Sequence, residues 1–382
     1  MAIDYFSADS LIQFLAYLRT QDVDPKEYKL HIDKYLNFKA RRKGIPISGQ
    51  FELTPLCNLD CKMCYVHLNG TELGGKSLLP VERWKDLMRQ AHEAGMLSAG
   101  LSGGECLTYP GFEELYIYLH RMGVNVTVLT NGVLIDDDKI RLFQKYPVSL
   151  VRISLYGSCD DAYENVTGHR AFSRVYDNLK RLRDAKLPVS VAVTPNGLMY
   201  DDFKALLRVI TDLQIPYNIN YGLIAPREGT GRGKIDLTDE QYLDIYKYSS
   251  ELNDEHLETV DIGELPDEGT DAVPQSGLIC SAGRSSFNIR WDGVLSACAS
   301  LYDVCEDLSG TTFAEAWKRL NHKANTYLRP GECNDCAYNN SCNLCAAMHR
   351  DSGSPGHCDR RICARTKKMI AEGLIKMPSS IR

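Results

Sequence analysis

Three cysteines lie close together near the start of the chain, with the spacing Cys57-x-x-x-Cys61-x-x-Cys64. Three thiolates on one short loop can bind three irons of a [4Fe–4S] cluster and leave the fourth iron without a protein ligand. Because such clusters are usually held by four cysteines, this set predicts an open coordination position for a small molecule. The alternatives are a zinc loop or unrelated buried thiols. Structural zinc needs four ligands, and only His67 is near enough to complete the set.

The tripeptide Gly103-Gly104-Glu105 follows the next predicted strand along the chain. Two adjacent glycines let a ligand approach bare backbone, and the carboxylate can complement an ammonium group. A simple turn would use the same residues. The position of the tripeptide in the predicted fold is therefore what favours a ligand-binding role. Both it and the cysteine loop come at the carboxyl end of a predicted strand, where the active-site loops of (β/α) barrels gather.

Short β-rich runs alternate with amphipathic helices from about residue 49 onward. The predicted strands are 49–54, 98–102, 125–130, 150–155, 189–194 and 217–221, and three of the predicted helices are 84–94, 172–185 and 203–213. Successive βα units require a parallel sheet covered by helices. Six units are too few for a closed eight-stranded barrel, so we expect an α/β fold built as an open or partial (β/α)6 barrel.

The chain divides into four predicted segments: an N-terminal helical extension (1–48), the barrel (49–235), an acidic bridge (236–279) and a cysteine-rich domain (280–382). The stretch between Lys247 and Arg284 has nine acids and no Lys or Arg, which predicts a partly irregular surface segment. The tail after Cys342 is basic, with eight Lys or Arg against three acids. A closing helix is expected at 365–376.

Cysteines return in number in the C-terminal segment. They are Cys280, Cys298, Cys305, Cys333, Cys336, Cys342, Cys345, Cys358 and Cys363. Cys280 and Cys298 flank the run 287–295, which predicts a hairpin turning at Asp292-Gly293. The pairs Cys333-x-x-Cys336 and Cys342-x-x-Cys345 stand five residues apart. A two-pair zinc ribbon separates its pairs by roughly 15–20 residues, so this spacing does not fit that template.

Composition excludes several classes of protein. The 382 residues are 44% hydrophobic and 25% charged, as in an ordinary globular protein with one large and one smaller domain. A net charge of −6 argues against nucleic-acid binding. The sequence has no apolar run long enough for a membrane span and no signal-peptide features at residues 1–5. We therefore expect a cytoplasmic protein whose fourteen cysteines are metal ligands rather than disulfides.

The cysteine loop followed by Gly-Gly-Glu resembles the radical S-adenosylmethionine (radical SAM) family, and the C-terminal cysteine pattern resembles its SPASM extension. The resemblance covers about residues 49–370 and implies a cluster on Cys57, Cys61 and Cys64 whose open iron is chelated by SAM. In the family an aromatic residue usually precedes the third cysteine, where this chain has Met63. The resemblance also implies a set of SAM-contacting residues: Tyr65, Gly103, Gly104, Glu105, Thr130, Asn131, Ser154, Arg170 and Thr194.

The SPASM resemblance further implies two auxiliary [4Fe–4S] clusters. The ligands of the first would be Cys280, Cys298 and Cys345, with Cys305 as fourth ligand or the position left open to substrate. The ligands of the second would be Cys333, Cys336, Cys342 and Cys363, with Cys358 competing for the last place. The family has three residues between the last two cysteines of the middle group, and this chain has two. Cys106 and Cys159 are left over as expected buried free thiols.

The resemblance implies an oxygen-sensitive enzyme in which an electron from a flavodoxin or ferredoxin cleaves SAM to methionine and a 5′-deoxyadenosyl radical. That radical would abstract hydrogen from a precursor peptide, leading to a thioether or carbon–carbon crosslink or to epimerisation. Ala299 stands where sulfatase maturases have an acid, which disfavours that role, and the 48 residues before the barrel are too few for a winged-helix leader-binding module. Haem-precursor side-chain removal is the alternative activity. A multi-cluster electron carrier would leave the open site without a purpose.

Overall fold

The computed structural model describes residues 28–68, 73, 75–224, 235–254, 277–334, 336–338, 341–342, 345–351 and 357–375. A single sheet runs through them in the strand order β6-β5-β4-β3-β2-β1-β7-β8-β9. The strands are β1 (Ser48–Glu52), β2 (Ser98–Ser102), β3 (Asn125–Thr130), β4 (Leu150–Ser154), β5 (Val189–Val193), β6 (Tyr217–Ile219), β7 (Ser286–Ile289), β8 (Val294–Ser296) and β9 (Cys305–Asp307).

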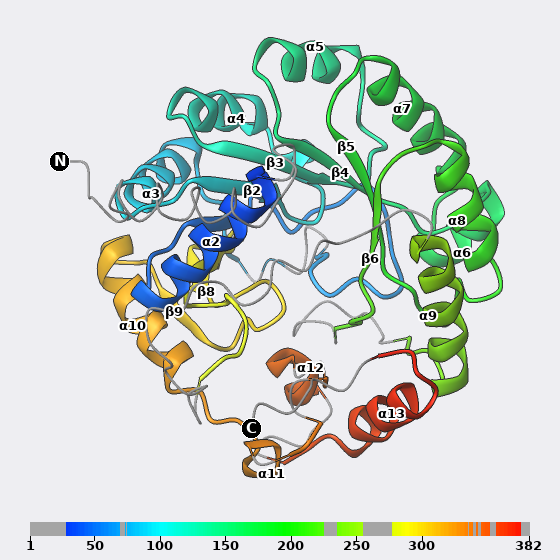
Figure 1. Cartoon of the computed structure of the whole chain (residues 1–382). Helices are drawn as coiled ribbons and strands as arrows, with labels where there is room; N and C mark the ends of the chain where they lie inside the picture. Colours follow the sequence, from blue (N-terminus) through cyan, green and yellow to red (C-terminus); the bar gives the residue numbers. More distant parts are fainter. Residues whose placement is uncertain are drawn as a thin grey trace.

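Strands β1 to β6 are parallel neighbours, and helices cover their outer side (Figure 1). This confirms the predicted partial (β/α)6 barrel, with each strand within two residues of its expected ends. The helices between the strands are α3 (Val81–Glu93), the short 3-10 helix η2 (Cys106–Thr108), α4 (Phe112–Arg121), α5 (Asp137–Lys145), α6 (Asp160–Thr167), α7 (Phe172–Asp184) and α8 (Phe203–Asp212).

The two faces of the barrel sheet differ in character. Residues that alternate along the strands are fully buried against the outer helices, as when the ring of Phe51 on β1 meets the edge of Trp84 on α3 at 6.1 Å. The intervening positions face the inside of the barrel, and many are polar: Gln50, Glu52, Ser102, Thr127, Arg152, Ser154 and Ser190. A polar interior suits a binding chamber rather than a packed core.

The predicted hairpin around Asp292-Gly293 is present as the antiparallel pair β7 and β8. The sequence did not reveal that β7 also pairs in parallel with β1, with Ser286 opposite Ser48. Phe287 on β7 packs its ring 5.9 Å from that of Phe51 and 4.9 Å from that of Phe313 on α10 (Phe313–Asn325). The barrel sheet and the C-terminal segment are therefore one continuous structure.

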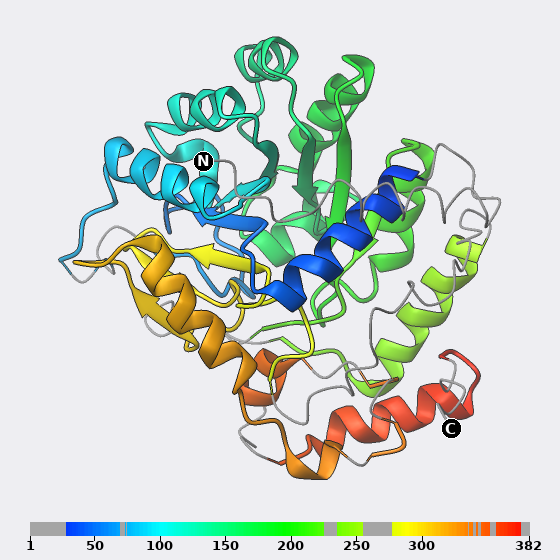
Figure 2. The same cartoon turned by 60° about the vertical axis from the view of Figure 1, so that its left-hand side comes forward.

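The N-terminal helix α2 (Tyr28–Lys43) is tied to the C-terminal segment. Arg41 donates a hydrogen bond to the carbonyl of Ile279 at 3.0 Å, and the indole of Trp317 on α10 donates to the carbonyl of Gly44 at 2.7 Å. In Figure 2 this helix crosses the foreground of the molecule. None of the described helices combines the length and apolar character that crossing a bilayer requires.

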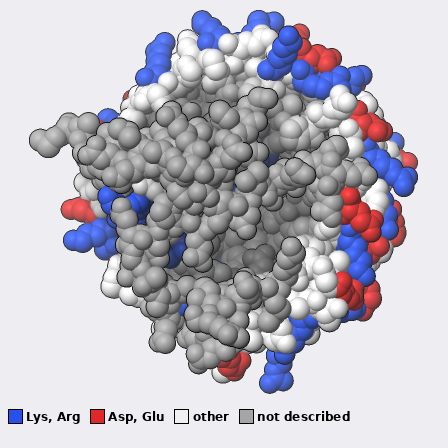
Figure 3. All heavy atoms as spheres, in the orientation of Figure 1, with Lys and Arg blue, Asp and Glu red and all other residues white. Residues whose placement is uncertain are grey.

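Charged side chains line the rim of the face in Figure 3, where Lys and Arg stand along the upper edge and mix with Asp and Glu along the right-hand edge. The right-hand edge is formed by the outer helices together with α9 (Asp239–Asp254) and α13 (Arg360–Ala371) (Figure 1). The remaining described helices are α11 (Gly331–Asn334) and α12 (Ala346–Asp351), which lie near α13.

One helix prediction requires correction. The first part of the predicted acidic bridge is the regular helix α9, in which Leu243 and Ile245 are buried; residues 255–276 lie outside the described part. The closing helix begins at Arg360 instead of residue 365, because the side chain of Asp359 caps it by accepting from the backbone N–H groups of Arg361 and Ile362.

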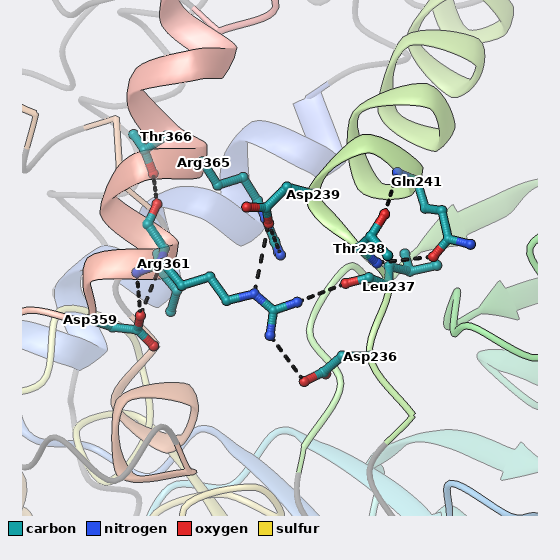
Figure 4. A network of polar contacts seen from close by, with 10 residues as sticks. Asp236, Leu237, Thr238, Asp239, Gln241, Asp359, Arg361, Arg365 and Thr366 are labelled. Atoms are coloured by element: carbon teal, nitrogen blue, oxygen red, sulfur yellow. Dashed lines mark hydrogen bonds and ion pairs between the residues drawn. The ribbon is translucent and has the colours of Figure 1, made fainter.

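A network of ion pairs joins α13 to α9 (Figure 4). Arg365 donates two hydrogen bonds to one carboxylate oxygen of Asp239, at 2.9 and 2.6 Å, and its guanidinium lies 4.2 Å from the ring centre of Tyr242. Arg361 donates to the carbonyl of Leu237 at 2.9 Å. Arg365 is only 14% exposed, so this contact is partly shielded from water and stronger than a surface pair.

We expect Arg365→Gln to lower the free energy of unfolding by about 1–3 kcal/mol, because the substitution removes a charge-assisted hydrogen bond and a ring contact. Urea unfolding measures this. Arg360→Gln, on the same helix but exposed, is the matched control and should change little. Equal stability of the two variants would contradict a structural role for the network.

Candidate functional site

The cysteine loop leaves the carboxyl end of β1 and holds all three thiols in a partly buried position. Backbone N–H groups point at two of the sulfurs: Leu59 donates to Sγ of Cys57 at 3.5 Å, and His67 donates to Sγ of Cys64 at 3.1 Å. Hydrogen bonds of this kind stabilise thiolate sulfur and tune the potential of a bound cluster. The loop is thus formed in a way that suits iron–sulfur ligation.

The loop is anchored to the end of helix α6. Asp60 and Lys62 donate backbone hydrogen bonds to the carbonyls of Thr167 and Val166, both at 2.9 Å. Gly168, which ends α6 in a left-handed conformation with φ 74°, brings its backbone close to Asp60. Thr167 and Gly168, at the carboxyl end of α6, therefore contact and support the cysteine loop.

Gly103 and Gly104 pack directly beneath the same loop. The N–H of Gly104 donates to the carbonyl of Thr54 at 2.7 Å, and the N–H of Glu105 donates to that of Leu56 at 2.9 Å. A Cβ on Gly103 would meet the oxygen of Thr54 at 2.3 Å, and a Cβ on Gly104 would meet that of Leu56 at 2.4 Å. Real Cβ atoms do not come this close to backbone, so both positions need glycine for packing of the cluster loop.

The carboxylate of Glu105 is buried, with 1% of the residue exposed. It accepts hydrogen bonds from Oγ1 of Thr130 at 2.9 Å and from the backbone N–H groups of Asn131 at 2.8 Å and Leu107 at 3.0 Å. Burial raises its pKa, and these three hydrogen bonds, with a fourth from the thiol of Cys106 at 3.7 Å, oppose that rise. Burying the ionised carboxylate therefore lowers the free energy of unfolding. This loss of stability grows as the pH rises above the pKa of an ordinary glutamate.

Asn131 connects this carboxylate to the cysteine loop. Its side-chain Nδ2 donates to Oδ1 of Asn58 at 2.8 Å and lies 3.7 Å from Sγ of Cys57. Burial raises the pKa of Cys57 to about 12, against the lowering effect of the Leu59 N–H. A thiol of that kind is protonated at neutral pH, so binding of iron must displace a proton.

The structure brings most of the predicted SAM-contacting residues to one end of the barrel. Thr130 and Asn131 end β3, Ser154 ends β4 and Thr194 follows β5. Arg170 is the exception, because its guanidinium lies on the surface in ion pairs with Asp161 and Glu164. Its charged end is not among the groups that surround the cysteine loop.

Tyr156 belongs to the strand-end sequence Ser154-Leu155-Tyr156-Gly157, which the resemblance to the family places among the SAM contacts. Burial, together with the charges of Cys61, Cys64 and Tyr65 nearby, raises its pKa. Met63, in contrast, is buried in the hydrophobic core with 6% exposed. Tyr65, Tyr156 and Tyr163 are aromatic residues near the cysteines of the loop.

The C-terminal cysteines form two groups. Cys298 is influenced by the charges of Cys280 and Cys345, and burial raises its pKa to about 11. The charged groups that act on Cys305 are instead Lys323, Arg290, Asp303 and Glu306. Cys305 on β9 therefore lies near several charged side chains.

The second group contains both competing cysteines. One small cavity is lined by Cys333, Cys336, Tyr338, Cys342, Cys358, Cys363 and Thr366. The thiol of Cys358 is in hydrogen-bond contact with Cys333 and Cys363, and Oγ1 of Thr366 donates to Sγ of Cys342 at 3.6 Å. The donor set of soft thiols fits an iron–sulfur cluster. Of the leftover thiols, Cys106 is buried as expected, but Cys159 is exposed just before α6.

No three His, Cys, Asp or Glu side chains in the described residues are arranged around a single metal ion. A four-iron cluster does not require its ligands to surround a single metal ion, because each cysteine binds a different iron of the cluster.

Comparison with known proteins finds one similar family and several similar proteins. Residues 51–210 match the family described as "Radical SAM superfamily". The chain is 26% identical over 265 residues to SkfB, the sporulation killing factor maturation protein of Bacillus subtilis, across 66% of this chain and 60% of SkfB. It is 24% identical over 349 residues to AlbA of the same organism, an antilisterial bacteriocin subtilosin biosynthesis protein, across 87% and 74%. It is also 26% identical over 220 residues to the Fe-coproporphyrin III synthase of Methanosarcina barkeri, across 57% and 53%.

Among solved structures, Streptococcus suis SuiB bound to precursor peptide SuiA superimposes with a TM-score of 0.66 at 16% identity, covering 88% of this chain and 81% of SuiB. The chain thus spans about 60% of SkfB and about half of the coproporphyrin synthase, but most of the SuiB fold. Residues 51–210, which contain the cysteine loop and Gly103-Gly104-Glu105, are thus similar to the radical SAM superfamily.

We expect Glu105→Ala to lower the free energy of unfolding by about 2 kcal/mol or more, because it leaves buried donors without an acceptor. It should also weaken SAM binding about tenfold if the carboxylate meets the SAM ammonium group. Thr130→Val removes one donor and should give a smaller loss of stability. Calorimetry for SAM and urea unfolding measure the two effects.

Glu113→Ala, on the exposed side of α4, is the control for both measurements. Reduced stability with unchanged SAM affinity would show that Glu105 only positions the loops. Unchanged stability would contradict the hydrogen-bond arrangement described above.

Proposed function

We propose that the protein is a radical SAM–SPASM enzyme that modifies a precursor peptide. The observation that carries this proposal is the cysteine loop with an open three-thiol set, held by Gly103, Gly104 and Asn131 at the mouth of a partial barrel. The bound cluster and SAM would supply a 5′-deoxyadenosyl radical. The chain's own residues would bind the SAM amine and carboxylate, place the adenosyl group over the polar barrel interior and limit the access of water.

Roles for individual residues follow from their positions. Tyr65 and Tyr156, beside the loop, are suited to pack against the adenine, and Ser154 and Thr194 are suited to bind ribose or carboxylate oxygens. Glu105 would meet the SAM ammonium through whichever lone pairs its four protein donors leave free. We do not assign Arg170 a role in binding SAM, because its ion pairs on α6 already use its charge.

Two auxiliary clusters are part of the proposal. For the second cluster, we propose Cys333, Cys336, Cys342 and Cys363 as the resemblance implies; Cys358, which lines the same cavity, is the competing fourth ligand. For the first cluster, we propose Cys280, Cys298 and Cys345 with an iron left open to the substrate, since the surroundings of Cys305 are ionic.

A cavity of about 340 Å³ lies between the barrel and the C-terminal helices and suits an entering peptide. Pro195 and Tyr221 line it from the ends of β5 and β6, and Met348 and Ile362 line it from α12 and α13. The outer edge of β6 is unpaired within the described sheet, so an extended chain could add to it by backbone hydrogen bonds. SkfB and AlbA, which are named for peptide maturation and biosynthesis, support the same substrate class.

Iron content tests the three-cluster proposal. We expect about twelve irons per chain after anaerobic reconstitution, and roughly eight in the triple variant Cys57→Ala, Cys61→Ala, Cys64→Ala, because each cluster contains four irons. Cys363→Ala should lose iron from the second auxiliary site, whereas the neighbouring Cys358→Ala should keep it. An iron content near four in the wild type, or stoichiometric zinc, would contradict the auxiliary clusters.

The substrate class is tested with a precursor peptide encoded beside the gene. In the presence of SAM and reduced flavodoxin or dithionite, we expect loss of a pair of hydrogens per crosslink, or deuterium uptake from labelled water without a mass change in normal water if the enzyme epimerises. Mass spectrometry measures both. Decarboxylation of a coproporphyrin-type ligand, with no change to the peptide, would favour the tetrapyrrole activity suggested by the Methanosarcina relative.

A further inference from the structure

Two polar side chains on the inner face of the barrel have no role in the site described above: Arg152 on β4 and Ser190 on β5. They are direct partners in the parallel pairing of these strands, so both side chains leave the same face of the sheet. Val151, Ile153 and Val191 on the opposite face are fully buried among the outer helices. Arg152 and Ser190 therefore point into the barrel.

Neither side chain has a hydrogen-bonding partner among the described residues. Nε of Arg152 and Oγ of Ser190 are buried and make no hydrogen bond in the part of the chain that the structure describes. Arg152 also forms no ion pair with any residue of that part, whereas Arg365 and Arg361 on α13 are both paired. A guanidinium is always charged, and Arg152 is half-buried, so part of its hydration is lost without a counterion among the described residues. Unmet polar groups of this kind call for a ligand as their explanation.

The guanidinium of Arg152 only donates hydrogen bonds, and the hydroxyl of Ser190 can donate one as well as accept, so both groups can bind a carboxylate. Adjacent strands lie about 4.8 Å apart, so the hydroxyl of Ser190 and the planar guanidinium of Arg152 can reach one carboxylate together. We infer that Arg152 and Ser190 form a carboxylate-binding site inside the barrel. Arg152 lies two residues before Ser154 on β4. The proposed site is therefore about 6.6 Å farther along the strand from the cysteine loop than Ser154 is.

Two ligands of the proposed function carry this chemistry, so the inference rests on that function. One is the carboxylate of SAM itself, and the other is an acidic residue or terminal carboxylate of the peptide that enters the barrel. The position of the site below Ser154 does not decide between these two carboxylates. An Arg side chain is long enough to extend toward the cysteine loop or toward the inside of the barrel. The experiment therefore has one arm for each source.

In the first arm, calorimetry compares SAM with decarboxylated SAM on the reconstituted protein. In the second, ligand-observed NMR compares two probe tripeptides, acetyl-Ala-Glu-Ala-amide and acetyl-Ala-Gln-Ala-amide. We expect the wild type to prefer the carboxylate form in one arm and Arg152→Gln to reduce that preference about tenfold. Ser190→Ala should reduce it less, and Arg152→Lys should retain part of it.

Arg208→Gln, exposed on α8, is the matched control and should keep the wild-type preference. Thermal unfolding gives an independent readout: Arg152→Gln should melt at the same or a higher temperature, because it removes an uncompensated charge. The inference is overturned if the wild type shows no carboxylate preference in either arm, or if Arg152→Gln keeps it. A lower melting temperature with unchanged preferences would likewise make Arg152 structural.

SAM cleavage to 5′-deoxyadenosine, measured on the same samples, separates this inference from the proposed function. Absence of cleavage in the wild type would overturn the proposed function whatever the affinities show. Normal cleavage without a carboxylate preference would overturn only the site at Arg152 and Ser190.

Discussion

The position of the cysteine loop depends on a close backbone contact between two strand ends. Gly103 and Gly104 lie so near to the carbonyls of Thr54 and Leu56 that no side chain fits between them. The buried carboxylate of Glu105 then fixes the next strand end through Thr130 and the backbone of Asn131. Three successive strands of the barrel are thereby joined at one point, directly beneath the thiols.

This arrangement gives the Gly-Gly-Glu sequence a structural reason that is independent of any ligand. Its glycines are required by the chain itself, and its glutamate already binds four protein donors. A contact between Glu105 and SAM would add to these bonds, and substitution of Glu105 would change the loop and the ligand site together. Stability and affinity must therefore be measured side by side.

The C-terminal cysteines are held to the barrel at two separate places. Strand β7 extends the barrel sheet next to β1, and α13 is bound to α9 through Arg365 and Asp239. Each attachment joins segments that are distant in sequence. The auxiliary cysteines therefore have a defined position relative to the barrel mouth, which a radical enzyme needs if a substrate is to contact both regions.

Local sequence patterns predicted the barrel well. They did not predict contacts between residues that are far apart in the sequence. Short β-rich runs marked the strands, and apolar residues three or four positions apart marked the helices between them. The pairing of β7 with β1 leaves no such signal, since it joins residues more than two hundred positions apart. The surface position of Arg170 and the lack of a partner for Arg152 likewise depend on which side chains the fold brings near, and spacing alone does not encode this.

The central claim is that the loop of Cys57, Cys61 and Cys64 holds a cluster with an iron open to SAM. Electron paramagnetic resonance of the dithionite-reduced protein, recorded with and without SAM, tests it directly. The account predicts that SAM changes the cluster signal of the wild type, and that the variant lacking these three cysteines keeps only signals insensitive to SAM. A wild-type spectrum unaffected by SAM, or a variant that still responds to it, would contradict the account.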